Sequence, residues 1–192
     1  MTSARDRLLD AAEKLTYRRG IRGAGTEAII DAADTARMSL YNYFGSKEKL
    51  VVAVLKRRDE RWMAWLSGDV EARGLPPGTE KILAVFDALA SWFGSTEFNG
   101  CAFINAAAET PSASSPIRRI ALDHKRKLRA YLEGLCREAG LPQATKVAGQ
   151  LFILVEGATV TALVDRASPA AREARSAARA LLQNLAPAIE PS

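Results

Sequence analysis

The chain has 192 residues, of which 48% are hydrophobic and 26% charged, so it is long enough for a hydrophobic core and has the composition expected of a soluble globular protein. Its net charge of +5 favours an acidic partner without naming one. The two cysteines, Cys101 and Cys136, are too few and too far from the single histidine to predict a disulfide framework or a zinc site, which fits a reducing cytoplasm.

Helical periodicity runs through the whole chain, and no period-2 run of β-branched residues bounded by turns predicts a strand. Caps and breakers set the expected ends: Gly20 stops the first helix, Ser46 caps the fourth, and Ser115-Pro116 and Ser168-Pro169 open two later ones. About nine helices are predicted, two of them within residues 26–45 and the others over residues 3–19, 46–72, 78–93, 101–109, 115–139, 144–165 and 168–185. The predicted fold class is all-α.

Residues 26–50 carry the strongest functional signal. A short helix with Ile29 and Ile30 on one face is followed by a tight polar break and by a second short helix rich in polar and aromatic residues. Gly45 ends this second helix. Two short helices joined by a turn of three or four residues are typical of a helix-turn-helix DNA-binding motif, whose second helix enters the major groove.

The motif and its flanks resemble the DNA-binding domain of the TetR family of bacterial transcriptional regulators. The matching residues cover about 5–57 and include Arg7-Leu8-Leu9, Ala11-Ala12, Gly20, Ile29-Ile30, Ala33, Leu40-Tyr41, Phe44, Lys47 and Leu50. The turn departs from the family pattern, because Asp34 stands where glycine is usual and Ala36 where a serine caps the second helix. Aspartate tolerates left-handed backbone, so the turn is expected to be kept. The lost cap costs about 1 kcal/mol unless Thr35 replaces it.

The resemblance implies an N-terminal domain of three helices, residues 1–46, which we call the reader, and an effector-binding and dimerisation domain, residues 47–192. The charge agrees with this division. Residues 1–58 hold 12 basic and 7 acidic residues, and residues 59–192 hold 15 of each, so the whole positive excess lies beside the motif. A modest surface bias that needs no partner is the alternative explanation.

In and directly after the reader lie the residues expected to contact DNA. Arg37 can bond guanine through two donors, Ser39 can bond either base type, and Asn42 is placed to touch bases or backbone. Tyr41, Tyr43, Lys47 and Thr26 are better suited to phosphates. For the tyrosine at 41, a half-buried packing role is the alternative. The predicted DNA-binding residues are Thr26, Arg37, Ser39, Tyr41, Asn42, Tyr43 and Lys47.

The resemblance implies a small-molecule effector bound among the C-terminal helices. That region is rich in aromatic side chains, and pockets are mostly apolar with a few polar groups. The candidate ligand-binding residues are Trp62, Trp65, Phe86, Trp92, Phe103, Asn105, His124, Tyr131, Phe152 and Glu156. Plain core packing is the alternative for each aromatic. The effector is expected to be apolar or aromatic.

The resemblance also assigns the last two helices to a homodimer interface, and both are rich in small and branched residues. The candidate interface residues are Leu151, Val155, Ala158, Ala162, Ala174, Ala178, Leu181 and Leu185. The apolar run Val147–Val164 contains Gln150 and Glu156, which makes it a better buried or interface helix than a membrane span. No membrane partner is therefore expected.

These features predict a cytoplasmic, homodimeric regulator of bacterial transcription that binds a double-stranded operator and is released from it by an effector. A constitutive regulator with a vestigial pocket is the main alternative. A helical-bundle enzyme is the remote one, because a di-metal bundle needs Glu-x-x-His and the residue three before His124 is Ala121. No catalytic residue, metal site or cofactor is predicted.

Overall fold

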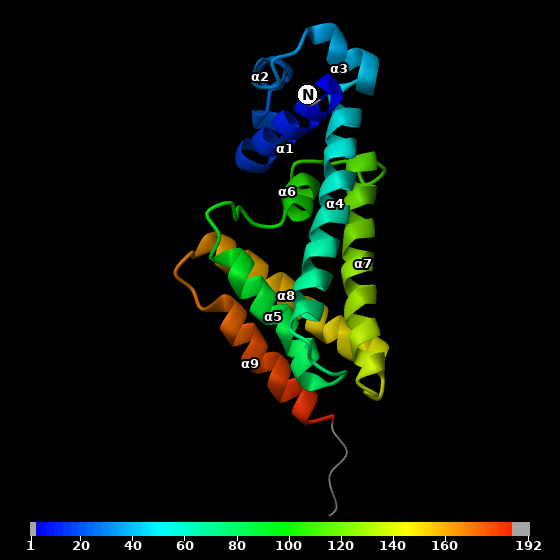
Figure 1. Cartoon of the computed structure of the whole chain (residues 1–192), viewed down its shortest axis with the longest axis vertical. Coiled ribbons are helices and arrows are strands. Elements are labelled where there is room, and N and C mark those ends of the chain that lie inside the picture. The colour runs from blue at the N-terminus through cyan, green and yellow to red at the C-terminus, as the bar shows by residue number, and fades with distance from the viewer. Residues whose placement is uncertain (1–2, 186–192) are drawn as a thin grey trace, which may run out of the picture. The chain divides into compact units, whose positions relative to one another are not determined.

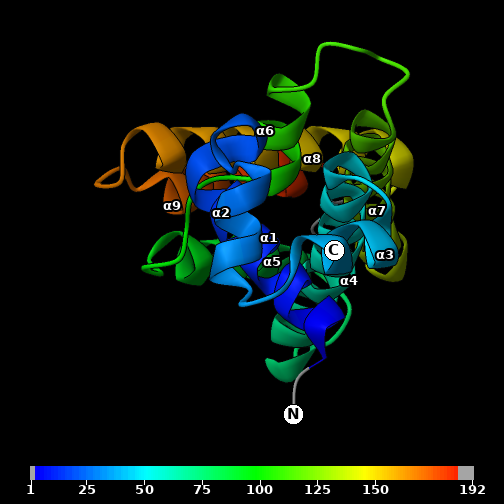
Figure 2. The ribbon, with the colours of Figure 1, turned by 90° about the horizontal axis from the view of Figure 1, so that it is seen from above.

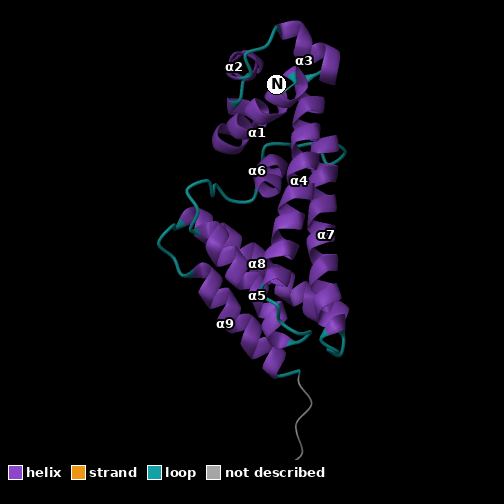
Figure 3. Ribbon diagram, viewed as in Figure 1, coloured by secondary structure: helices purple, strands orange, loops and turns teal. Residues whose placement is uncertain are grey.

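The computed structural model describes residues 3–185, and within that range the chain forms nine helices and no strand (Figures 1 and 3). The all-α prediction and the helix count are confirmed. The helices are α1 (Ala4–Gly23), α2 (Thr26–Ala32), α3 (Arg37–Phe44), α4 (Lys47–Ala72), α5 (Thr79–Phe93), α6 (Ala102–Ala108), α7 (Pro116–Glu138), α8 (Ala144–Val164) and α9 (Ala170–Gln183).

Side-chain caps start the helices at two of the predicted places. The Ser46 hydroxyl accepts the Lys49 N–H at 3.1 Å before α4, and the Ser115 hydroxyl accepts the Ile117 N–H at 3.2 Å at the start of α7. Two ends differ from the prediction by a few residues. The backbone leaves helical geometry at Gly20, but one more turn carries α1 on to Gly23. Pro169 is the N-cap of α9 rather than its first helical residue.

The helices divide into two compact units. The first unit ends at Trp62 and takes in Cys101–Lys125 as well. The second unit contains Met63–Gly100 and the described residues from Arg126 onward. Both α4 and α7 begin in the first unit and end in the second. The functional division after residue 46 stays a prediction.

Two apolar cores stabilise the first unit, and α4 contributes to both. Leu50 and Val54 join residues of α1, α2 and α3 in the core of the reader, where Leu8, Ile29 and Leu40 are fully buried. One position further along, Val51 and Leu55 join residues of α6 and α7 in the other core. The four-residue spacing places each pair on its own face of the helix.

In the second unit α5, α8 and α9 pack against one another. Figure 2 gives a second view of these helices. Leu83 and Phe86 of α5 and Leu151 of α8 are fully buried there, and Arg179 of α9 forms an ion pair with Glu80 of α5 at 2.7 Å. Within the described residues α8 alone is long and apolar enough to cross a membrane, a property that core helices share. Its packing against α5 and α9 agrees with the predicted buried helix.

Candidate DNA-binding interface

The turn between α2 and α3 keeps its shape without the usual glycine. Asp34 has a φ of +47°, so the aspartate does adopt the expected left-handed backbone. Arg7 of α1 stabilises the turn, because its guanidinium donates to the carbonyl oxygens of Ala33 and Asp34 at 2.9 and 3.0 Å. Thr35 does not replace the lost cap: α3 has no side-chain cap, and the Thr35 hydroxyl is buried without a hydrogen-bond partner.

Helix α3 has two faces with different tasks. Leu40 and Phe44 are buried in the core of the reader and fix the helix against α1 and α2. Arg37, Asn42 and both tyrosines project into solvent. Tyr41 is 41% exposed, which favours the predicted contact role over half-buried packing. The exposed face thus presents donors and acceptors on a helix whose other face is anchored.

Arg37 already has partners on the protein. Its Nη1 lies 3.0 Å from Glu27 Oε1 of α2, and each side chain is 63% exposed. A hydrogen bond with Tyr41 and the Glu27 carboxylate raise the pKa of Arg37 above its ordinary value. The guanidinium therefore remains charged, and it must exchange the Glu27 carboxylate for a base edge to read DNA.

Three further predicted residues are less exposed. Ser39 is half-buried on α3, and Thr26 is half-buried at the first position of α2. Lys47 is half-buried at the start of α4, where its ammonium group donates to the Ile21 carbonyl oxygen at 2.7 Å. This bond closes the end of α1. An ammonium group has three N–H donors, and this bond uses one of them, so the other two can bind a phosphate. The phosphate contact of Lys47 stays a prediction.

Sequence reasoning missed Met38 and Arg7. Met38 is 65% exposed on α3, next to Arg37, and an apolar side chain there suits the methyl group of thymine. The sequence did contain a pattern that could have identified Met38, because it is a large apolar residue among polar ones on the second helix of the motif. Arg7 was noted only as part of a pattern, although it holds the turn carbonyls in place.

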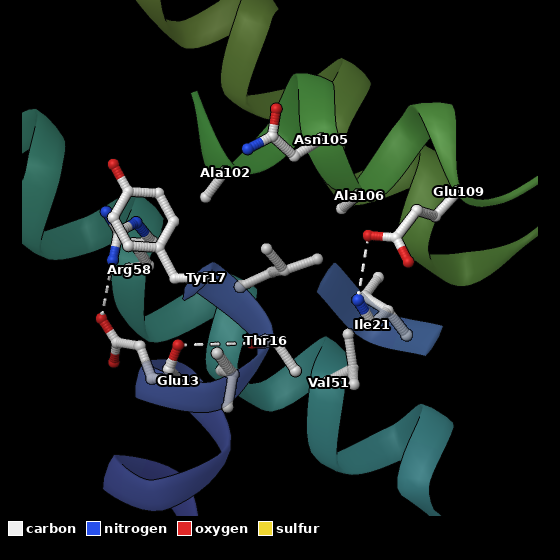
Figure 4. A pocket seen from close by; sticks show the side chains of 12 residues that line it. Glu13, Thr16, Tyr17, Ile21, Val51, Arg58, Ala102, Asn105, Ala106 and Glu109 are labelled. Carbon is white, nitrogen blue, oxygen red and sulfur yellow. Dashed lines mark hydrogen bonds and ion pairs between the residues drawn. The ribbon is translucent and has the colours of Figure 1, made fainter. Parts of the chain in front are cut away.

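A carboxylate at the C-cap of α6 holds the end of α1. Glu109 accepts the backbone N–H group of Ile21 at 2.9 Å (Figure 4) and that of Arg22 at 2.8 Å. This contact depends on Gly20, whose φ is +76°, because a Cβ there would lie 2.5 Å from Glu109 Oε1. Beside the contact, α1, α4 and α6 enclose a cavity of about 20 Å³, room for about one water molecule, and Asn105 is among its lining residues.

Three candidate effector residues lie together in the first unit. The ring of Phe103 stacks on that of His124 with centroids 3.7 Å apart, and Trp62 meets the same imidazole edge-on at 5.2 Å. His124 Nδ1 lies 2.8 Å from Asp59 Oδ1, and both side chains are buried. Asp59 was not predicted, because one carboxylate in the run Arg57-Arg58-Asp59-Glu60-Arg61 looks like surface charge.

The other candidates belong to the second unit. The rings of Trp65 and Trp92 are 6.4 Å apart, whereas Phe86 is completely buried and takes the core role that was its alternative. Burial raises the pKa of Tyr131 to about 12, and its hydroxyl has no hydrogen-bond partner among the described residues. The remaining candidates, Phe152 and Glu156, are half-buried on α8.

The candidate interface residues of α8 and α9 are mostly used inside the protomer. At most 8% of each of six of these side chains is exposed, namely Leu151, Val155, Ala158, Ala162, Ala174 and Ala178. Leu181 and Leu185 are half-buried. These six side chains are covered by helices of the protomer itself and offer little surface to a partner, and their assignment to an interface stays a prediction. The exposed apolar residues of α8 lie elsewhere: Ile153 is 66%, Val160 45% and Val164 82% exposed.

Two family models match the chain. Residues 8–54 match the model of the bacterial regulatory proteins of the tetR family. Residues 78–178 match the model of the C-terminal domain of LmrA/YxaF-like transcriptional regulators. Together they cover the helix-turn-helix and most of the remaining helices. Among the described residues no group of three His, Cys, Asp or Glu side chains is arranged to hold a metal ion.

Curated proteins and solved structures give the same picture. The HTH-type transcriptional regulator LmrA of Bacillus subtilis is 27% identical over 169 residues, which are 86% of this chain and 89% of LmrA. The crystal structure of a TetR-family regulator from Streptomyces coelicolor superposes with a TM-score of 0.85 at 27% identity and covers 95% of both chains. A tetR-type regulator from Streptomyces avermitilis is 32% identical, with a TM-score of 0.76 over 92% of this chain and 98% of that one.

Proposed function

Because the chain belongs to the tetR family of bacterial DNA-binding transcriptional regulators, we propose that it is a cytoplasmic, homodimeric repressor that a small molecule releases from a palindromic operator. The family and the matched relatives are transcriptional regulators and not enzymes. The observation that supports the proposal best is the contact between Glu109, the C-cap residue of α6, and the end of α1, because this contact connects the reader to a helix outside it.

Sequence-specific binding would come from the exposed face of α3. Arg37 is proposed to read a guanine, and Met38 to contact a thymine methyl group at a neighbouring position. Asn42 and the two tyrosines would contact bases or phosphates nearby. The buried Leu40 and Phe44 hold this face at a fixed angle to α1, which supports reading at defined base positions.

Release would use the Glu109 contact. Its carboxylate accepts two N–H groups that the end of α1 would otherwise leave without acceptors, so a displacement of α6 costs hydrogen bonds in the reader. Lys47 holds the same segment from α4 through the Ile21 carbonyl oxygen. An effector that moves α6 or α4 would therefore disturb α1, and a coupling of about 1–3 kcal/mol changes operator affinity by about 5- to 150-fold.

The dimer would form through an exposed strip of α8 that we call the α8 stripe: Ile153, Gly157, Val160 and Val164. These residues follow one another at intervals of four, three and four, so they share one face of the helix, and all four are exposed. Ala177 and Leu181 of α9 border the same groove as Ile153. A twofold axis through this surface would pair it with itself and present two readers to half-sites about 34–36 Å apart.

The proposal is tested first by selecting bound sequences from a random duplex pool. An inverted repeat with half-sites one helical turn apart is expected, and a lone half-site would contradict the homodimer. A compound library is then screened by thermal shift, and each hit is titrated against the protein–operator complex. A library that stabilises nothing and releases nothing would favour a constitutive regulator.

Glu109→Gln tests the coupling, because the amide is close to the carboxylate in shape but has only one acceptor oxygen. The variant is expected to bind a releasing compound with unchanged affinity and to need a different concentration of it for operator release. Glu173→Gln on the exposed surface of α9 is the matched control and should behave as wild type. Identical release curves for both variants and wild type would place the coupling elsewhere.

A further inference from the structure

An open groove lies on the surface of the first unit between α6 and the N-terminal half of α7. Its volume is about 590 Å³, within the range of about 300–1,000 Å³ that is typical of sites for small organic molecules. Apolar side chains supply most of the lining, and three cations complete it. The lining residues are Ile104, Ala107, Ala108, Ala113, Ala121, Leu122, Arg118, Arg119 and Lys125.

The cations of the groove differ from others of the same unit in how they are held. Arg57, Arg58 and Arg61 surround the Glu13 carboxylate, so their charge is partly compensated. Arg118 instead donates to the carbonyl oxygens of Ala107 and Thr110 at 3.3 and 3.1 Å. Neutral carbonyls fix the position of a guanidinium without cancelling its charge.

Arg119 is held in the same way, by the Ser114 carbonyl oxygen at 2.5 Å. In the described part of the chain no carboxylate forms an ion pair with Arg118 or Arg119. Lys125 reaches the Sγ of Cys101 at 3.3 Å from the same side of α7. None of the described residues that line the groove is acidic. The groove therefore combines an apolar floor with two guanidinium groups, those of Arg118 and Arg119, that neutral carbonyl oxygens hold in place.

We propose that this groove binds an amphipathic organic anion: an acidic head group, such as a carboxylate, on Arg118 and Arg119, and an apolar body over Ile104, Ala121 and Leu122. A guanidinium pairs with a carboxylate through two parallel N–H donors, and hydrogen bonds to charged groups are about twice as strong as neutral ones. Leu122 is 49% exposed, and its burial by the apolar body would add to the affinity. The site is distinct from the aromatic side chains proposed for the effector and does not depend on DNA binding.

The experiment uses the full chain without DNA and two fluorescent probes, 1-pyrenebutyrate and its neutral analogue 1-pyrenebutanol, with anisotropy as the readout. The acid is expected to bind with one site per chain and at least tenfold more tightly than the alcohol. Equal binding of both probes would overturn the anion site. Binding of the acid that weakens as the chain concentration rises would show that a second copy covers the groove, and would overturn it too.

Substitutions at Leu122 locate the probe without touching the arginines. Leu122→Gln and Leu122→Glu have the same size at an exposed position, but only the second places a carboxylate one helical turn from Arg118, where it competes with the head group for the guanidinium. We expect the glutamate variant to bind 1-pyrenebutyrate about 10- to 100-fold more weakly than the glutamine variant, with equal melting temperatures. Equal affinities would remove the probe from the groove.

Arg118→Gln/Arg119→Gln provides a second test, with Arg126→Gln/Lys127→Gln on the same helix as a control of equal charge. Only the first pair is expected to weaken binding of the acid. If both pairs weaken it alike, long-range charge and not a site explains the affinity. If a random DNA duplex displaces the acid from the wild type, and Arg118→Gln/Arg119→Gln weakens duplex binding to the same extent as acid binding, the groove is a nucleic-acid surface and the proposal is wrong.

Discussion

Helix α3 is proposed to bind DNA and helix α8 to bind a second protomer. The two helices differ in how far the sequence alone identifies the face that makes the contact. In α3 the apolar residues Leu40 and Phe44 are four apart and buried, and the three polar or aromatic residues between them are exposed. In α8 apolar residues occupy almost the whole circumference, and both Val155, 2% exposed, and Val160, 45% exposed, look suitable for an interface. A helix with one apolar stripe defines its orientation in the sequence, whereas a helix that is apolar all round does not.

The largest expected effect separates the two faces of α8. Ala158→Glu should reduce the stability of the folded protomer by about 3–5 kcal/mol, because it places a carboxylate without a partner in the core of the second unit. Val160→Glu should leave the melting temperature of the protomer nearly unchanged and shift the chain from dimer to monomer in sedimentation. Val160→Ala is the control and should remain a dimer. A dimeric Val160→Glu variant would place the interface outside the α8 stripe.

On α3 the comparison predicts an effect on DNA binding without an effect on stability. Arg37→Ala should relax the preference at one base position by about 5- to 150-fold, the range for loss of a bidentate contact to guanine. The melting temperature should not change, because the side chain is largely exposed. Selection of bound sequences from a random pool measures the preference. An unchanged base preference would remove Arg37 from the base-reading set.

The fold could be predicted from the sequence because its local signals agree. Ser46, Ser115 and Gly45 mark helix ends that the structure keeps. The residues that the sequence could not identify act over long separations. Arg7 supports a turn that begins 26 residues later, and Glu109 binds N–H groups 88 and 87 residues earlier. Periodicity describes the faces of a helix and not the partner that each face meets, so such contacts leave no local pattern.

The candidate effector site shows the same limit. The sequence marked Phe103 and His124 as separate candidates, and their rings stack in the structure. It also marked Phe86, which is simply buried. Aromatic side chains fill cores and line pockets through the same apolar surface, so composition alone does not separate the two uses.

Lys47→Ala tests whether a residue that closes a helix also binds phosphate. The salt dependence of DNA binding should fall by about one unit of slope if the ammonium group neutralises one phosphate. Loss of the bond to the Ile21 carbonyl oxygen should also lower the melting temperature slightly. Lys49→Ala, an exposed lysine of the same helical turn, is the control for general charge. A lower melting temperature with an unchanged slope would show that Lys47 only closes α1.

The smallest expected effect concerns the carboxylate beside the base-reading arginine. Glu27→Gln removes the ion pair that Arg37 must break on DNA, and an exposed pair of this kind changes an equilibrium only about two- to fivefold. Operator affinity should therefore rise by that factor, and the gain should shrink as salt screens the pair. Repeating the substitution in Arg37→Ala separates two causes in a double-mutant cycle. The gain should vanish there if the ion pair is responsible, whereas an equal gain in both backgrounds would mean that Glu27 acts by repelling the phosphates.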